Sequence, residues 1–281
     1  GFDRVLRAGL DKNKRLRVFG PQGTVDKLTQ RIHSYEIPNH PFQRLQIEVT
    51  EVWPERLLSA TLKATDGFPT PRVREDSWSG RQLYVTADFA VDALFVDHTA
   101  PCLAYGLTER GGIHPDRRKL SAGLLKPGPW IGQVQDHIAQ GVTSGPMIEI
   151  QGGRFPLASL IADYFTSSAG YRVVFVTDTR WTDAVAPGLL ELAGKADLLF
   201  CDAYYARAQA DKAAKHGHLT TDQAAALAKS AQVKTLVPMH FGSRYHGRLD
   251  RLVAEMVEIF PNTVPWLDDQ APGALGQGAG G

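Results

Sequence analysis

Aspartate and histidine residues that follow apolar, strand-like runs are the side chains of this chain best suited to metal or acid–base chemistry. Asp178 ends the run Val-Val-Phe-Val-Thr-Asp, Asp202 ends Leu-Leu-Phe-Cys-Asp, and His240 follows a short β-rich run. His98 lies in a turn between two β-like runs, and His218 comes directly before a helix. Carboxylates and imidazoles that converge at strand ends are suited to a divalent metal such as zinc. Taken singly, each has a plain alternative: Asp178 could cap a turn, and a lone histidine is more often structural.

Regular elements must hold these side chains in place. The sequence predicts buried strands at residues 172–177 and 197–200 and a shorter one at 235–237, because each is rich in β-branched or apolar residues. Thr220 is a suitable N-cap for an alanine-rich helix over residues 221–231. His218 and His240 therefore lie at the ends of rigid elements, which suits a metal or acid–base site.

The rest of the chain interleaves strand-like and helix-like segments. We expect strands at 15–19, 45–52, 57–65, 82–87, 93–96 and 102–107, helices at 24–34, 117–125, 184–192 and 249–260, and a loop-rich stretch at 126–156. Strands dominate the first part and β–α alternation the second. This pattern predicts an α/β architecture in which helices cover the outer faces of sheets.

Composition bounds the class of protein. The 281 residues are 43% hydrophobic with a formal net charge of +1, which suits a sizeable core and gives no global sign of a strongly basic nucleic-acid binder. The chain has two cysteines, which we interpret as buried thiols of a reducing compartment. No run of about 18 apolar residues and no signal peptide are visible, so we expect a cytoplasmic protein without a membrane partner.

Two local clusters of basic residues stand out against the neutral average. One lies near the start of the chain, and the other lies before and within the predicted loop-rich stretch. Each could be an ordinary solvated face or an RNA-binding patch. Their members are Arg4, Arg7, Lys12, Lys14, Arg15 and Arg17, and then Arg110, Arg117, Arg118, Lys119 and Lys126.

Several of these segments together resemble the ribonuclease Z family of the metallo-β-lactamase superfamily. The most specific are the last two, His-Leu-Thr at His218 and His-Phe-Gly-Ser-Arg-Tyr from His240 to Tyr245, in that order. Four more segments are similar to family motifs: Phe-Gly-Pro-Gln-Gly from Phe19, Asp-His at 97–98 with Pro101 and Tyr105, Thr-Asp-Thr around Asp178, and Cys-Asp-Ala around Asp202, where the family usually has Glu-Ala.

The resemblance implies a metallo-β-lactamase-like αββα sandwich and a role for each candidate residue. His98 would bind one zinc ion and His240 a second, with Asp178 bridging both. His218 would donate a proton during catalysis, supported by Asp202. Two zinc ions held about 3.5–4 Å apart would serve cleavage of a phosphodiester.

The resemblance also implies a substrate. Lys126, Gly128 and Pro129 belong to a Gly-Pro segment similar to one that helps the family bind RNA, and Arg244 and Tyr245 could hold a substrate phosphate or cap the strand end. We therefore expect a zinc-dependent phosphodiesterase of the endoribonuclease type. Its substrate would be RNA, with the 3′ ends of precursor tRNA as one candidate, or a small phosphodiester. The alternatives are a hydrolase of a small ester, sulfate or lactam and a metal-poor, non-catalytic relative. The sequence leaves a homodimer open.

One family motif is absent from this sequence. His-x-His-x-Asp-His normally lies immediately before a segment resembling Gly-Phe-Asp-Arg-Val-Leu at residues 1–6. We expect the complete protein to carry this motif and its leading strands upstream, and a degenerate relative is the alternative. The expected organisation is a hydrolase domain over 1–269, partial at its N-terminus, and a disordered tail over 270–281.

Overall fold

The computed structural model describes residues 1–10, 12–35 and 43–265, and it divides the chain into two compact units. The first unit comprises Gly1–Leu83, Val91–Gly106 and Val173–Gly281, and the second comprises Tyr84–Ala90 and Leu107–Arg172. The expected tail at 270–281 lies outside the described residues. None of the helices in the described ranges has the length and apolar character needed to cross a membrane.

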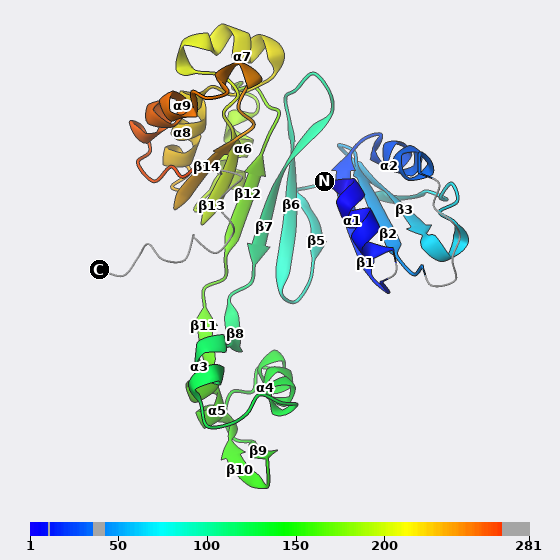
Figure 1. The fold of residues 1–281 in the computed structure, drawn as a ribbon, viewed down its shortest axis with the longest axis vertical. Coiled ribbons are helices and arrows are strands. Elements are labelled where there is room, and N and C mark those ends of the chain that lie inside the picture. The colour runs from blue at the N-terminus through cyan, green and yellow to red at the C-terminus, as the bar shows by residue number, and fades with distance from the viewer. Residues whose placement is uncertain (11, 36–42, 266–281) are drawn as a thin grey trace. The chain divides into compact units, whose positions relative to one another are not determined.

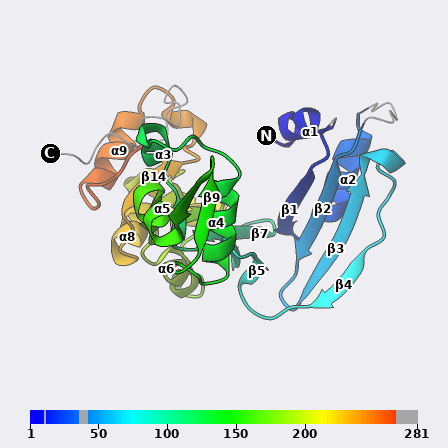
Figure 2. The ribbon, with the colours of Figure 1, turned by 90° about the horizontal axis from the view of Figure 1, so that it is seen from below.

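A four-stranded sheet with the order β1-β2-β3-β4 forms one part of the first unit (Figure 2). β1 pairs parallel with β2, while β2–β3 and β3–β4 are antiparallel. One face packs on two helices, because Ile47, Val49 and Leu62 point toward Leu6 of α1 and Val25 of α2. The elements are α1 (Phe2–Gly9), β1 (Arg15–Pro21), α2 (Thr24–His33), β2 (Gln46–Val52), β3 (Arg56–Lys63), the 3₁₀ turn η1 (Ala64–Asp66) and β4 (Arg74–Ser77).

A six-stranded sheet with the order β14-β13-β12-β7-β6-β5 forms the other part (Figure 1). β12, β13 and β14 run parallel to one another. The strands are β5 (Gln82–Val85), β6 (Phe89–Val96), β7 (Cys102–Glu109), β12 (Arg172–Val176), β13 (Leu198–Asp202) and β14 (Thr235–Met239). The helices of this part are α6 (Ala186–Ala193), η2 (Arg207–Gln209), α7 (Ala210–His216), α8 (Thr221–Ser230), η3 (Ser243–Tyr245) and α9 (Leu249–Val257).

The largest core of the unit lies between this sheet and its helices. Leu189 of α6, Leu199 of β13, Leu227 of α8 and Leu236 of β14 are fully buried in it, together with Cys201. Full burial of one such leucine is worth about 1.5–3 kcal/mol. The core therefore fixes the three parallel strands against α6 and α8. The expectation of a buried thiol is confirmed at Cys201, whereas Cys102 is half-buried and both cysteines are free.

A smaller cluster joins the two sheets of the first unit. Val52 of β2 packs with Ala93 of β6 and Leu103 of β7, and all three are buried. The Tyr105 hydroxyl donates a hydrogen bond of 3.0 Å to the Phe19 carbonyl oxygen of β1. The predicted α/β class, with helices covering sheets, is confirmed.

The second unit has its own small core. Trp130 and Val134 of α4 pack with Ile148 of β9 and with Leu157 and Leu160 of α5. The elements are β8 (Gly112–Pro115), α3 (Arg117–Ala122), α4 (Trp130–Ala139), β9 (Met147–Ile150), β10 (Gly153–Pro156), α5 (Leu157–Tyr164) and β11 (Phe165–Ser168), with β8 paired to β11 and β9 to β10.

The prediction that residues 126–156 form a loop-rich stretch is wrong. The stretch contains α4, β9 and β10. Trp130, Val134 and Ile138 recur at helical spacing, and the first two are buried by residues up to Leu160. Glycine and proline suggested a loop, but this long-range burial stabilises the helix and hairpin between them.

Candidate metal and acid–base site

The carboxyl ends of the three parallel strands meet at one edge of the six-stranded sheet. The register pairs Val176 of β12 with Cys201 of β13, and Asp202 of β13 with Met239 of β14. Asp202 therefore ends its strand beside the residue that precedes His240, and Asp178 follows β12 by two residues. Ligands in α/β proteins commonly bind at such an edge.

Two of the candidate residues have an unusual backbone. Asp178 has φ = 51° and His240 has φ = 58°, both in the left-handed region. This region costs a residue with a side chain about 1–2 kcal/mol. Such conformations persist where the surrounding structure over-determines them, and they cluster at functional sites. Both turns lie immediately after strands, where the chain leaves the sheet.

Asp202 is the centre of the site. Its side chain is fully buried, and both oxygens accept hydrogen bonds. Oδ1 accepts from the Tyr204 amide at 2.9 Å, and Oδ2 accepts from the Asp178 amide at 3.2 Å and from His218 Nδ1 at 2.9 Å. Because a carboxylate only accepts, His218 Nδ1 carries the hydrogen. His218 Nε2 is then left for a metal or for proton transfer.

Two capped helix ends hold His218. Gly217, at φ = 79°, ends α7, and the His218 amide donates to the Ala213 carbonyl at 3.0 Å, as in a Schellman-type helix end. Thr220 and Gln223 form a capping box at the start of α8, so the predicted N-cap is confirmed. The four residues between the helices therefore have little freedom.

His98 lies beside His218. Their ring centroids are 5.2 Å apart, and His98 Nδ1 hydrogen-bonds the Gly217 carbonyl at 2.9 Å. A Cβ on Gly217 would lie 2.5 Å from His98 Nδ1, so only glycine permits this approach. The hydrogen bond occupies Nδ1, which leaves Nε2 as the nitrogen that His98 can offer to a metal.

The donor set fits a divalent metal ion. Asp178, Asp202, His218 and His240 each offer a ligand atom, and these four atoms lie within 4.8 Å of one another. Mixed imidazole nitrogen and carboxylate oxygen donors suit zinc and related ions. His240 Nδ1 lies 3.3 Å from Asp178 Oδ1 and 3.8 Å from Asp202 Oδ2.

These carboxylates also affect the proton affinity of His240. Interaction with the nearby Asp202 carboxylate raises the pKa of His240, the charge of Asp178 adds to this, and partial burial opposes it. A metal ion that binds this nitrogen has to displace the proton that the His240 imidazole carries when it is charged. The acceptors around His240 are thus arranged for a cation.

Arg244 and Tyr245 lie close to this edge of the sheet, in η3 after His240. The Tyr245 hydroxyl accepts from the Ala206 amide at 3.1 Å and donates to Gln209, which fits the strand-end structural role. Arg244 is exposed, with its guanidinium carbon 4.9 Å from the centre of the Tyr205 ring. Arg244 is therefore the freer of the two for a substrate phosphate.

The Gly-Pro segment lies in the second unit, directly before α4. The Lys126 carbonyl accepts from the Trp130 indole at 3.0 Å, and the Gly128 carbonyl accepts from the Ile131 amide at 3.1 Å. The side chains of Lys126 and Pro129 are exposed. Of the nearby basic residues, Lys119 donates to the Ala162 and Phe165 carbonyls and has a structural contact, whereas Arg117 and Arg118 are exposed.

Tyr204 is the site residue that the sequence analysis missed. Its ring stacks on His218 with centroids 4.3 Å apart and planes at 14°, and it meets His240 edge-on at 5.3 Å. The only signal in the sequence was a pair of tyrosines that begins two residues after Asp202.

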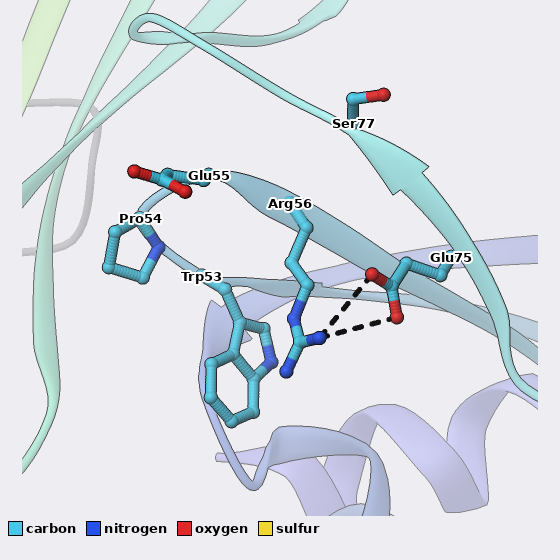
Figure 3. A pocket seen from close by; sticks show the side chains of 6 residues that line it. All are labelled: Trp53, Pro54, Glu55, Arg56, Glu75 and Ser77. Carbon is cyan, nitrogen blue, oxygen red and sulfur yellow. Dashed lines mark hydrogen bonds and ion pairs between the residues drawn. The ribbon is translucent and has the colours of Figure 1, made fainter.

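A separate hollow of about 710 Å³ lies on the four-stranded sheet, away from these ligands in the sequence. In Figure 3, Arg56 lies between Trp53 and Glu75. The Arg56 guanidinium carbon is 4.4 Å from the centre of the Trp53 ring, and Nη1 is 3.3 Å from Glu75 Oε1. Arg56 and Glu75 are thus paired with each other, and none of the residues that line this hollow is a candidate metal ligand.

Comparison with known proteins gives consistent relatives. Residues 146–241 match a family model described as a Beta-lactamase superfamily domain. The chain is 32% identical over 253 residues to Ribonuclease Z of Deinococcus radiodurans, covering 87% of this chain and 72% of that protein. It is 32% identical to Ribonuclease Z of Thermobifida fusca (73% and 61% covered) and 35% identical to that of Nocardia farcinica (65% and 54%). The chain thus spans between about half and three quarters of these relatives.

Among solved structures, the metallo-beta-lactamase fold protein YhfI from Bacillus subtilis aligns with a TM-score of 0.48 and 14% identity, covering 94% of this chain and 67% of that one. Human tRNase Z, short form, aligns with a TM-score of 0.46 and 17% identity, covering 88% and 68%.

Proposed function

This chain belongs to the ribonuclease Z family, within the metallo-β-lactamase superfamily, and on that premise we propose that it is part of a zinc-dependent endoribonuclease that processes tRNA 3′ ends. The observation that carries the proposal is the cluster of Asp178, Asp202, His218 and His240 at one sheet edge, with ligand atoms within 4.8 Å of one another. Relatives named Ribonuclease Z support the reaction class.

Asp178, His240 and His98 would hold the metal. When bound, zinc supplies a nucleophilic hydroxide at neutral pH and polarises a phosphoryl oxygen. His98 Nε2 is free for this role because Nδ1 is bonded to Gly217. Asp178 lies within 3.7 Å of both His218 and His240, so it is placed to serve as a shared ligand.

His218 would be the general acid that protonates the leaving oxygen. Asp202 accepts the Nδ1 hydrogen, which fixes the orientation of the ring and leaves Nε2 as the atom that would give up a proton. The competing role is that of a fourth metal ligand, since His218 belongs to the same cluster as Asp178 and His240. The two roles differ in what loss of the side chain does to bound metal.

RNA would contact exposed basic side chains beyond the metal site. Arg244 follows His240 closely, and Arg117, Arg118 and Lys126 are exposed on the second unit. Phosphate contacts of this kind release counterions, which makes binding fall steeply with salt. A small ester has no such reach.

The test uses the full-length protein loaded with zinc, assayed on precursor tRNA and on a nitrophenyl phosphodiester, before and after removal of the metal by a chelator. We expect metal-dependent cleavage of both. His218→Ala should lower turnover of RNA by about 10²–10⁴-fold while bound zinc, measured by elemental analysis, is unchanged.

Loss of zinc in His218→Ala would make His218 a ligand. Hydrolysis of small esters without any RNA cleavage by the parent would contradict the proposed substrate and favour the small-ester alternative. Absence of bound zinc in the full-length parent would contradict the proposal as a whole.

A further inference from the structure

The aromatic ring of Tyr204 is the closest ring neighbour of the proposed acid. It stacks nearly parallel on His218, at 4.3 Å and 14°, while the ring of His98 is 5.2 Å away and tilted by 58°. The same ring meets His240 edge-on, at 5.3 Å and 69°. Tyr204 thus contacts two of the imidazoles through one side chain.

A hydrogen bond alone does not orient His218. The bond from Nδ1 to Asp202 fixes one ring atom, but the second side-chain torsion of histidine has broad minima. Even a rotation about the Cβ–Cγ bond that is small enough to keep this hydrogen bond would change the direction in which Nε2 points. A parallel ring in van der Waals contact defines the imidazole plane, and stacked pairs of this kind are worth about 0.5–1.5 kcal/mol.

Tyr204 is itself held on both sides of its backbone. Its amide donates to Asp202 Oδ1 at 2.9 Å, and its carbonyl accepts from the Gly242 amide at 3.2 Å. A Cβ on Gly242 would lie 2.9 Å from Tyr204 Cε1 and 3.0 Å from the Tyr204 carbonyl oxygen. Only a residue without a side chain at 242 leaves room for the tyrosine ring.

The geometry points to Tyr204 as a positioning residue: stacking of its ring sets the plane of the His218 imidazole, so that Nε2 faces the leaving oxygen, and Gly242 provides the space. This inference rests on the proposed function in taking His218 as the acid. Tyr204 acts through His218, so its effect falls on the chemical step and on substrates whose leaving group needs a proton.

Leaving groups separate this role from a general structural one. The ribose oxygen must take up a proton as the P–O bond breaks, so that it leaves as a hydroxyl, whereas nitrophenolate departs without a proton. Tyr204→Leu should lower kcat on RNA by at least about tenfold, and by no more than the 10²–10⁴-fold that acid catalysis is worth, with KM and bound zinc unchanged. Hydrolysis of the nitrophenyl diester should stay close to the parent.

Tyr204→Phe is the matched control, because it keeps the ring and removes only the hydroxyl. It should retain parent activity on both substrates. Gly242→Ala should reproduce the Tyr204→Leu pattern without altering Tyr204, and it serves as the second variant if Tyr204→Leu does not fold. NMR gives a readout without turnover, since loss of the stacked ring should shift the His218 ring protons downfield.

Equal losses on RNA and on the nitrophenyl diester, or no shift of the His218 resonances in Tyr204→Leu, would overturn the inference. A loss in Tyr204→Phe as large as in Tyr204→Leu would assign the effect to the hydroxyl and not to the ring. If the parent cleaves no RNA, the proposed substrate fails, and the inference is still tested on aryl diesters with weakly acidic leaving phenols.

Discussion

Replacement of Asp202 by asparagine is the sharpest perturbation of this site, because the two side chains have the same shape. Asp202 is fully buried and accepts from three donors, two on Oδ2 and one on Oδ1. An amide has one acceptor oxygen, and its NH₂ group donates. Whichever way the asparagine turns, a donor faces either the Tyr204 amide or the pair formed by the Asp178 amide and His218 Nδ1.

The cost follows from this mismatch. A buried donor left without an acceptor costs about 1–3 kcal/mol. For domains of roughly 150–250 residues, 1 kcal/mol shifts Tm by about 2–4 °C, so Asp202→Asn should lower Tm by about 2–12 °C. In either orientation the negative charge beside His218 is lost as well, so turnover of RNA should fall by up to about 10²–10⁴-fold.

Thermal unfolding followed by circular dichroism, zinc content and kcat on precursor tRNA measure these effects. Asp211→Asn, the same change at an exposed carboxylate of α7, is the matched control and should leave all three unchanged. An Asp202→Asn variant with the parent Tm and the parent turnover would refute the reasoning that this carboxylate organises the site.

Two further predictions concern other contacts of the chain. Gly217→Ala should lower Tm more than Gly247→Ala: both pay about 1–2 kcal/mol for a left-handed backbone, but only the new Cβ at 217 would meet His98 Nδ1, at 2.5 Å, while nothing lies within 4 Å at 247. Equal shifts would argue against the contact. Arg117→Ala with Arg118→Ala should weaken RNA binding and reduce its salt slope by about 1 per lost phosphate contact, leaving ester hydrolysis intact; an unchanged slope would remove this surface from RNA recognition.

Local sequence signals were sufficient for most elements that carry the site. The apolar run before Asp178 forms β12, and the run that ends at Asp202 forms β13. Thr220 caps α8 as expected. Such patterns act over a few residues, through burial of alternating or β-branched side chains and through caps, so they are visible in one sequence. The types and order of the candidate ligands were visible for the same reason.

The tertiary structure decided what those local signals do not encode. The stacking of Tyr204 on His218 depends on Gly242, and the His98 contact depends on Gly217, 119 residues away along the chain. In the second unit, α4 forms where glycine and proline favoured a loop, because distant residues bury Trp130 and Val134. Each of these outcomes is set by close packing between segments far apart in sequence, and packing of that kind has no short-range pattern from which to be read.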